Sequence, residues 1–180
     1  MSLDLDKVFA QGGKKLVALL QHAVRAAQSD LLFVFLVEAY RQTPTAAKAV
    51  ALYRSFCAAD APARLSDLTL LPPVNPFLAA ALRPLEASLQ ASAGGSESRA
   101  GQPPLLPSKL LFDSVARQIR ASSPGMRTLR REYRIRKTPL QNLPGGKMTA
   151  SQRFFADRVW RPILKPRLVA AGFWRIAAID

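Results

Sequence analysis

The residue types that most often perform chemistry in proteins are nearly absent from this chain of 180 residues. Cys57 is the only cysteine and His22 the only histidine, and each falls in an apolar segment with helical spacing. A nucleophilic cysteine or serine usually needs a nearby base, most often histidine, and a structural zinc ion needs about four Cys or His ligands. We therefore expect Cys57 and His22 to be structural, with no disulfide within the chain and no metal site.

Candidate acid–base groups are also few. The second half of the chain contains four carboxylates, Asp113, Glu132, Asp157 and Asp180. Glu132 lies among arginines, so we interpret it as their ion-pair partner. Leu143–Thr149 contains Gly-Gly-Lys, as a phosphate-binding loop does, but Met148 occupies the position of the required Ser or Thr and no apolar strand precedes it. We predict that the protein is not an enzyme and has no cofactor.

The strongest chemical signal is positive charge. The net charge is +14, and it is uneven: residues 1–100 hold ten Lys or Arg against eight Asp or Glu, whereas residues 101–180 hold sixteen against four. Between Arg127 and Lys137 there are six basic residues and one acid. A neutral half and a basic half predict that the first half packs and that the second meets a negatively charged partner.

The residues that we expect to contact this partner lie in two segments and the tail. The anion-binding candidates are Arg127, Arg130, Arg131, Arg134, Arg136, Lys137, Arg153, Arg158 and Arg161. The candidate interface aromatics are Phe154, Phe155, Trp160, Phe173 and Trp174. An apolar, aromatic tail is expected to dock, either on its own domain or on a neighbour.

Helical spacing predicts the elements that carry these residues. In the first half we expect helices over Lys14–Gln28, over Leu31–Arg41 with a Ser29-Asp30 cap, and from Thr43-Pro44 to about Ala58. A buried strand is the alternative for Leu31–Val37, but no second strand-like segment is available to pair with it. Another helix begins at Asn75-Pro76, and Pro84 is expected to kink or end it.

In the second half, Ser108 is predicted to begin a helix with a stripe of Leu111, Val115 and Ile119. A basic helix begins at Ser123-Pro124 and ends near Lys137, with Met126, Leu129 and Tyr133 on its apolar seam. Thr149-x-x-Gln152 is a capping box for a further helix. Pro162 and Pro166 are expected to break the segment that follows into short pieces.

These elements predict an all-α, irregular helical protein. We expect a small, near-neutral helical bundle over residues 1–90, a flexible Gly/Ser/Pro linker over 91–107, and an extended, basic, aromatic docking region over 108–180. The mean hydropathy of +0.04 excludes a disordered polyelectrolyte. The longest apolar run, Leu31–Val37, is far shorter than the roughly 20 residues that span a bilayer, so no transmembrane helix is expected.

The tripeptide Leu52-Tyr53-Arg54 resembles the motif that names the LYR family of mitochondrial accessory and assembly proteins. The resemblance covers three residues. In that family the helix continues past the motif with further basic and aromatic positions, whereas here Ala58–Pro62 is expected to end it within two turns. We prefer the alternative interpretation, in which the tripeptide consists of two core residues and a surface arginine.

The function that these features favour is that of a non-catalytic accessory subunit of a large mitochondrial inner-membrane assembly, such as a respiratory-chain complex or ATP synthase. Its basic half would dock to acidic partner subunits and anionic phospholipid, peripheral to the membrane. The composition, rich in Arg and Ala and poor in acids, favours the mitochondrion, and Asp4 and Asp6 argue against a cleaved presequence. The alternative is a mitochondrial ribosomal protein that binds rRNA through the same region, and a third interpretation is an ordinary solvated face.

Overall fold

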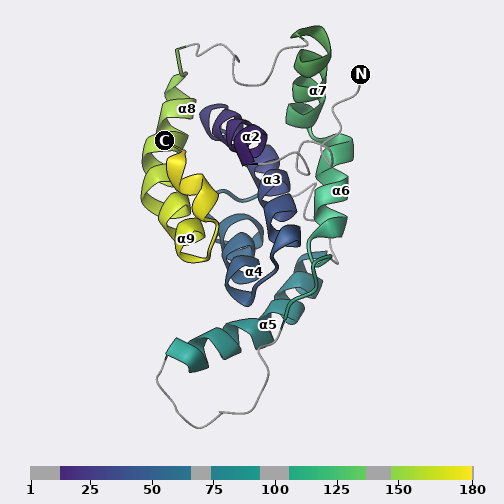
Figure 1. The fold of residues 1–180 in the computed structure, drawn as a ribbon, viewed down its shortest axis with the longest axis vertical. Coiled ribbons are helices and arrows are strands. Elements are labelled where there is room, and N and C mark those ends of the chain that lie inside the picture. Colours follow the sequence, from purple (N-terminus) through teal and green to yellow (C-terminus); the bar gives the residue numbers. More distant parts are fainter. Residues whose placement is uncertain (1–12, 66–73, 94–105, 137–146, 180) are drawn as a thin grey trace.

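The computed structural model describes residues 13–65, 74–93, 106–136 and 147–179, and every regular element in these ranges is a helix (Figure 1). The predicted all-α class is therefore confirmed. The elements of the first half are α2 (Gly13–Arg25), α3 (Ser29–Gln42), α4 (Ala46–Leu52), the π-helical η1 (Tyr53–Cys57) and α5 (Val74–Ala93). Those of the second half are α6 (Asp113–Ser122), α7 (Pro124–Arg136), α8 (Ala150–Phe154), the π-helical η4 (Phe155–Leu164), α9 (Lys165–Ala170) and the short 3₁₀ helix η5 (Trp174–Ala178).

Helix α3 is the centre of the fold. Every residue from Leu31 to Glu38 is buried, as expected for a helix that is apolar nearly all round. It packs against α2, α4, α6 and α7. In Figure 1, α2, α3 and α4 form a central layer. Helices α6 and α7 lie on one side of it and α8 and α9 on the other, while α5 extends away from it.

Helix starts in the first half differ in detail from the prediction. The Ser29-Asp30 cap was wrong, because Gln28 occupies the N-cap position and Asp30 lies in the first turn of α3, where it hydrogen-bonds the Ser123 side chain instead. Helix α4 begins two residues later than Thr43-Pro44 predicts, with Thr45 as its cap, which accepts a hydrogen bond from the Lys48 N–H at 3.2 Å. Ala58 is extended and ends η1, as predicted.

Three prolines lie within continuous helix. Helix α5 continues through Pro84, which is exposed and followed by the buried Leu85, so Pro84 does not end the helix, and the predicted kink stays a prediction. The chain is likewise helical without interruption from Ala150 to Ala170, although Pro162 and Pro166 were expected to break it. Pro162 is exposed within a π-helical segment, whose wider turn places the bonded carbonyl five residues back, and Pro166 lies near the start of α9, where a proline is tolerated.

The segment before α6 is a turn rather than a helix. Residues 109–112 form turns in which the Ser108 hydroxyl accepts from the Leu110 N–H at 3.2 Å, so the helix predicted from Ser108 begins only at Asp113. The turns place Phe112 in the core, where its ring meets those of Phe33 and Tyr40 edge to face, with centroids 5.9 and 5.5 Å apart. Tertiary packing of this aromatic cluster therefore determines where the helix starts.

Both halves of the chain contribute to one hydrophobic core. Residues of α2, α3 and α4 share it with residues of α6, α7, η4, α9 and the tail. The tail residues Phe173, Ile176 and Ile179 are buried in it, so the predicted docking of the tail takes place on the chain's own domain. Of the predicted linker 91–107, residues 94–105 lie outside the described residues, and α5 extends to Ala93.

Candidate functional site

The two residue types that we examined for catalysis occupy packed positions. Cys57 is fully buried, and burial raises the pKa of its thiol to about 12, so the thiol remains protonated at neutral pH. His22 is half-buried on the last turn of α2. Within the ranges listed above, no three His, Cys, Asp or Glu side chains are close enough to hold a metal ion.

Helix α7 presents its arginines outward. Met126 and Leu129 are buried on its seam, whereas Arg127, Arg130 and Arg131 are exposed and have no acidic partner among the described side chains. The backbones of Arg134 and Arg136 are helical, but their side chains, those of Tyr133 and Glu132, and the whole of Lys137 lie outside the described residues. The outward basic face is therefore described for three of its six predicted members.

The start of α7 is fixed against the connection between α2 and α3. Ser123 is buried and hydrogen-bonds Asp30; burial raises the pKa of the Asp30 carboxyl, and the Ser123 bond opposes this shift. Gly125 passes so close to this connection that a Cβ atom there would lie 2.9 Å from Oε1 of Gln28. A side chain at this position would displace the flexible end of Gln28, so Gly125 allows close contact between the start of α7 and the Gln28 side chain.

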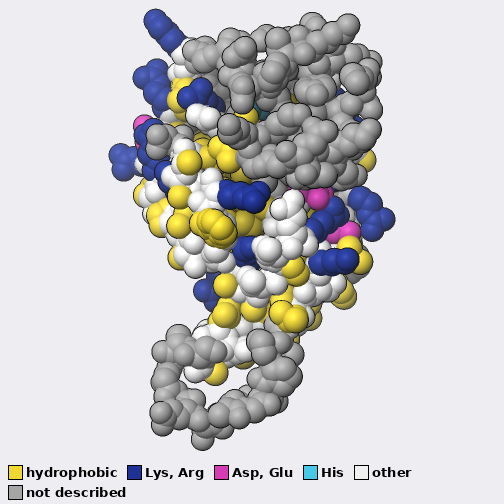
Figure 2. Space-filling model, viewed as in Figure 1, with side chains coloured by type: hydrophobic (Ala, Val, Ile, Leu, Met, Phe, Trp, Pro, Cys, Tyr) yellow, Lys and Arg dark blue, Asp and Glu magenta, His cyan; other side chains and the backbone are white. Residues whose placement is uncertain are grey.

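A second basic surface is formed by α8 and η4. Arg153, Arg158 and Arg161 are exposed, and Arg161 donates to the exposed carboxylate of Asp157. Phe154 is 64% exposed between them in sequence. Figure 2 shows Lys and Arg side chains along the edge of the molecule where Figure 1 places α8 and η4, next to a band of hydrophobic side chains. Arg153 and Arg158 have no acidic partner in the described part of the chain.

Two of the predicted interface aromatics are core residues instead. Trp160 is fully buried and Phe173 is buried in the core, while Phe155 is half-buried against it. Trp174, which is 73% exposed, and Phe154 are the two that face outward. The buried residues of η4 and α9 recur at every fourth position: Ala156, Trp160, Leu164 and Leu168. This spacing is the sequence signal that could have distinguished core from surface residues.

Two carboxylates, Glu38 and Asp113, belong to a charge network inside the protein that was not predicted from the sequence. Glu38 on α3 accepts from Arg41 and from Arg120 of α6, and Arg41 also donates to Oδ1 of Asp113 at 2.7 and 2.9 Å. Glu38 is buried, and the other three side chains are partly buried. These carboxylates balance arginines between α3 and α6, so they do not offset the positive charge of the outer surfaces.

The two basic surfaces are separate. Helix α7 packs against α6 and α3, whereas η4 packs against α2, and Figure 1 places α7 and α8 on different sides of α2. The structure thus does not bring the predicted anion-binding residues into one patch. It produces two outward arginine surfaces, and of the predicted interface aromatics the exposed Phe154 lies on the one formed by α8 and η4.

The tripeptide Leu52-Tyr53-Arg54 lies at the junction of α4 and η1. Leu52 is buried, Tyr53 is half-buried, and Arg54 is exposed and pairs with Glu86 of α5 at 2.9 Å. Comparison with protein-family models, with curated proteins and with solved structures gave no match. The resemblance to the LYR family therefore rests on these three residues.

Proposed function

We propose that the protein is a non-catalytic accessory subunit of a large mitochondrial inner-membrane assembly, such as a respiratory-chain complex or ATP synthase. It acts as a docking element, and its arginine surfaces contact acidic partner subunits and anionic phospholipid. No described helix is long and apolar enough to cross a bilayer. The proposed position is peripheral to the membrane, and the proposed location follows from the Arg- and Ala-rich, acid-poor composition.

The observation that carries this proposal is the surface of α8, η4 and η5. It combines the exposed Arg153 and Arg158, which lack acidic partners among the described residues, with the exposed rings of Phe154 and Trp174. A basic residue near an anionic membrane contributes about 1 kcal/mol of binding free energy. Trp side chains such as Trp174 prefer the membrane–water interface, where the apolar body and the polar N–H are both accommodated, and the exposed Phe154 ring adds apolar surface. This combination favours an anionic surface over a free acidic peptide.

Vesicle co-sedimentation tests the lipid contact. The full chain should bind vesicles with 30% anionic lipid and should fail to bind vesicles of neutral lipid only. An Arg153→Gln, Arg158→Gln double variant removes two charges and should weaken binding by roughly 2 kcal/mol, about thirtyfold. The matched control is Arg25→Gln, Arg83→Gln, which removes the same charge from exposed positions in the near-neutral half. Equal weakening by both double variants would show that net charge, and not this surface, determines binding.

Native purification tests the assembly. The protein should co-purify with detergent-solubilised inner-membrane particles and should remain with them after RNase treatment. Release by RNase, or RNA crosslinks that map to Arg127–Arg136, would replace this proposal with the ribosomal one. The salt dependence adds a second criterion, because each phosphate neutralised on RNA changes the slope of log affinity against log salt by about −0.7 to −0.9.

A further inference from the structure

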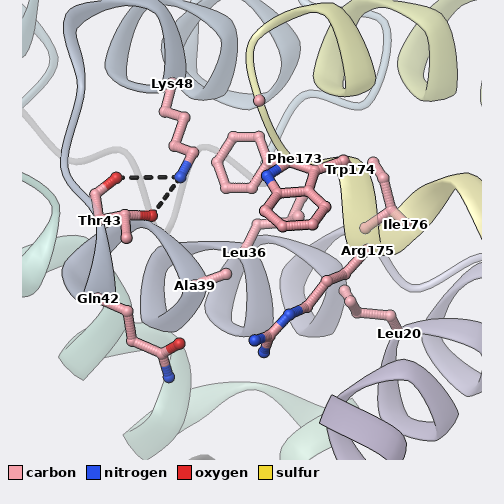
Figure 3. A pocket seen from close by; sticks show the side chains of 11 residues that line it. Leu20, Leu36, Ala39, Gln42, Thr43, Lys48, Phe173, Trp174, Arg175 and Ile176 are labelled. Atoms are coloured by element: carbon pink, nitrogen blue, oxygen red, sulfur yellow. Dashed lines mark hydrogen bonds between the residues drawn. The ribbon is translucent and has the colours of Figure 1, made fainter.

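A small pocket lies beneath the tail, and Trp174 of η5 is part of its rim. Its walls come from Leu20 of α2, the end of α3, the start of α4, and the segment Gly172–Ile176, and it encloses about 110 Å³ (Figure 3). No Asp or Glu is among the described residues that line it. The apolar lining residues are Leu20, Leu36, Ala39, Phe173, Trp174 and Ile176.

The polar end of the pocket is a buried lysine. Lys48 is 7% exposed, and its Nζ donates to the Thr43 carbonyl at 3.0 Å and to the Thr43 hydroxyl, while it lies 5.4 Å from the centre of the Phe173 ring. Both hydrogen-bond partners are neutral, and no carboxylate pairs with Lys48 among the described residues. Burial lowers the pKa of Lys48. A buried ammonium without a counter-ion is costly, and an anion in the pocket would remove most of that cost.

Two features support a charged amine at this position. Thr43 is the C-cap residue of α3, and the C-terminal end of a helix carries a partial negative charge that favours a cation. An ammonium group has three N–H donors, and Thr43 accepts from it twice. A third donor is therefore available for a ligand.

The mouth of the pocket adds a second cation and an aromatic wall. Figure 3 shows the guanidinium of Arg175 extending past Ala39 toward Gln42, with the Trp174 indole in front of Phe173. Arg175 and Trp174 are both exposed. Gly172 makes the turn that positions them, with a φ of +101° that only glycine adopts readily. The pocket therefore has a buried positive charge, apolar walls and a positive, aromatic rim.

We propose that this pocket binds a carboxylic acid with an aliphatic chain, its carboxylate on Lys48 and its chain running outward between Leu20, Ile176 and Trp174. The size fits, because a cavity of about 150 Å³ accommodates benzene, so the enclosed part takes the carboxylate and the first few carbons. A phosphate is disfavoured, since it carries about two charges and the buried part of the pocket offers one cation. The acid is a bound ligand and is not turned over.

Titration of the full chain with octanoate tests the site, with octanol as the uncharged probe of the same length. Octanoate should bind and should change the fluorescence of Trp174, and Trp174→Phe should remove that change because the remaining Trp160 is buried. Octanol should bind at least tenfold more weakly, as expected when a hydrogen bond to a charged group is lost. Equal binding of octanol and octanoate, or no octanoate binding at millimolar concentration, overturns the proposal.

Two variants separate the site from general stability. Lys48→Met keeps the stem that packs in the pocket and should weaken octanoate binding at least tenfold. Ala39→Leu fills the pocket and leaves Lys48 in place, so it should abolish binding even if Lys48→Met fails to fold. Arg83→Gln, an exposed charge change on α5, should leave it unchanged. Wild-type affinity in Lys48→Met or Ala39→Leu overturns the proposal. The titration contains no vesicles, so its failure is distinguishable from failure of the proposed membrane docking.

Discussion

The charge network between α3 and α6 gives the sharpest test of the fold. Glu38→Gln keeps the shape of the side chain and removes the carboxylate that receives hydrogen bonds from Arg41 and Arg120. Breaking a buried ion pair by neutralising one partner costs about 3–5 kcal/mol, because the other charge stays buried. Here the two arginine side chains remain 23% and 21% exposed, so water screens part of their charge. We therefore expect the lower end, about 3 kcal/mol.

Urea denaturation measures this loss of unfolding free energy directly, and the urea m-value should be unchanged. Thermal denaturation gives a second measurement: at about 2–4 °C per kcal/mol for a chain of this size, the thermal midpoint should fall by about 6–12 °C. The matched control is Asp157→Asn, which breaks the exposed pair with Arg161 and should cost less than about 1 kcal/mol. A loss in Glu38→Gln that is no larger than the loss in the control would refute the claim that the network ties α3 to α6.

Four further predictions concern single residues. Trp160→Ala should cost about 3–5 kcal/mol of unfolding free energy. Trp160→Phe should cost less than Trp160→Ala, since it leaves a smaller cavity and the indole N–H has no hydrogen-bond partner among the described residues. Phe154→Ala should change stability by less than about 0.5 kcal/mol and weaken vesicle binding instead. Burial raises the pKa of Cys57 from 9.0 to about 12 in the folded chain, so the folded state keeps the thiol proton at pH values where the unfolded chain loses it. The unfolding free energy should therefore be unaffected by this group below pH 9 and should fall as the pH rises from 9 toward 12. This alkaline decline should be shallower in Cys57→Ala. Gly172→Ala should cost about 1–2 kcal/mol, measured by urea denaturation, because its φ is +101°, and a loss near zero would contradict the strained turn.

Local patterns were enough to predict the helices, because burial of α3 on all sides and the capping box at Thr149 are encoded by neighbouring residues. The capping box is present with both of its hydrogen bonds. Tertiary contacts decided the features that were predicted wrongly. Asp30 hydrogen-bonds Ser123 rather than capping α3, and Phe112 enters an aromatic cluster rather than the helix predicted from Ser108.

The candidate site was predictable in its charge but not in its geometry. Exposed arginines follow from composition, since a chain with this excess of bases cannot pair them internally. Which aromatic rings face outward depends on helical phase: Ala156, Trp160 and Leu164 recur every fourth residue on the inward face, and Phe154 lies outside that spacing. The pocket around Lys48 joins α2, α3 and α4 to the tail, which lies at the other end of the sequence, so no local pattern could indicate it.

The separation of the two arginine surfaces leads to a last prediction about their partners. Two of the exposed aromatics, Phe154 and Trp174, lie on α8 and η5, whereas the third, Phe77, lies on α5, and the described side chains of α7 include no exposed aromatic ring. A lipid interface favours aromatics together with arginine, while an acidic protein surface requires only charge complementarity. We therefore assign the lipid contact to α8 and η4 and the acidic subunit to α7.

This assignment predicts different outcomes for matched variants. Arg127→Gln, Arg130→Gln on α7 removes two charges, as does Arg153→Gln, Arg158→Gln on α8 and η4. The α7 variant should leave vesicle binding within about twofold of wild type and should lower recovery of the protein in purified particles, because α2 separates α7 from the lipid-facing surface. The α8–η4 variant should weaken vesicle binding and should leave recovery of the protein in purified particles close to that of wild type. If both variants weaken vesicle binding to the same extent, the two surfaces contact one membrane together, and the acidic partner of α7 is lipid.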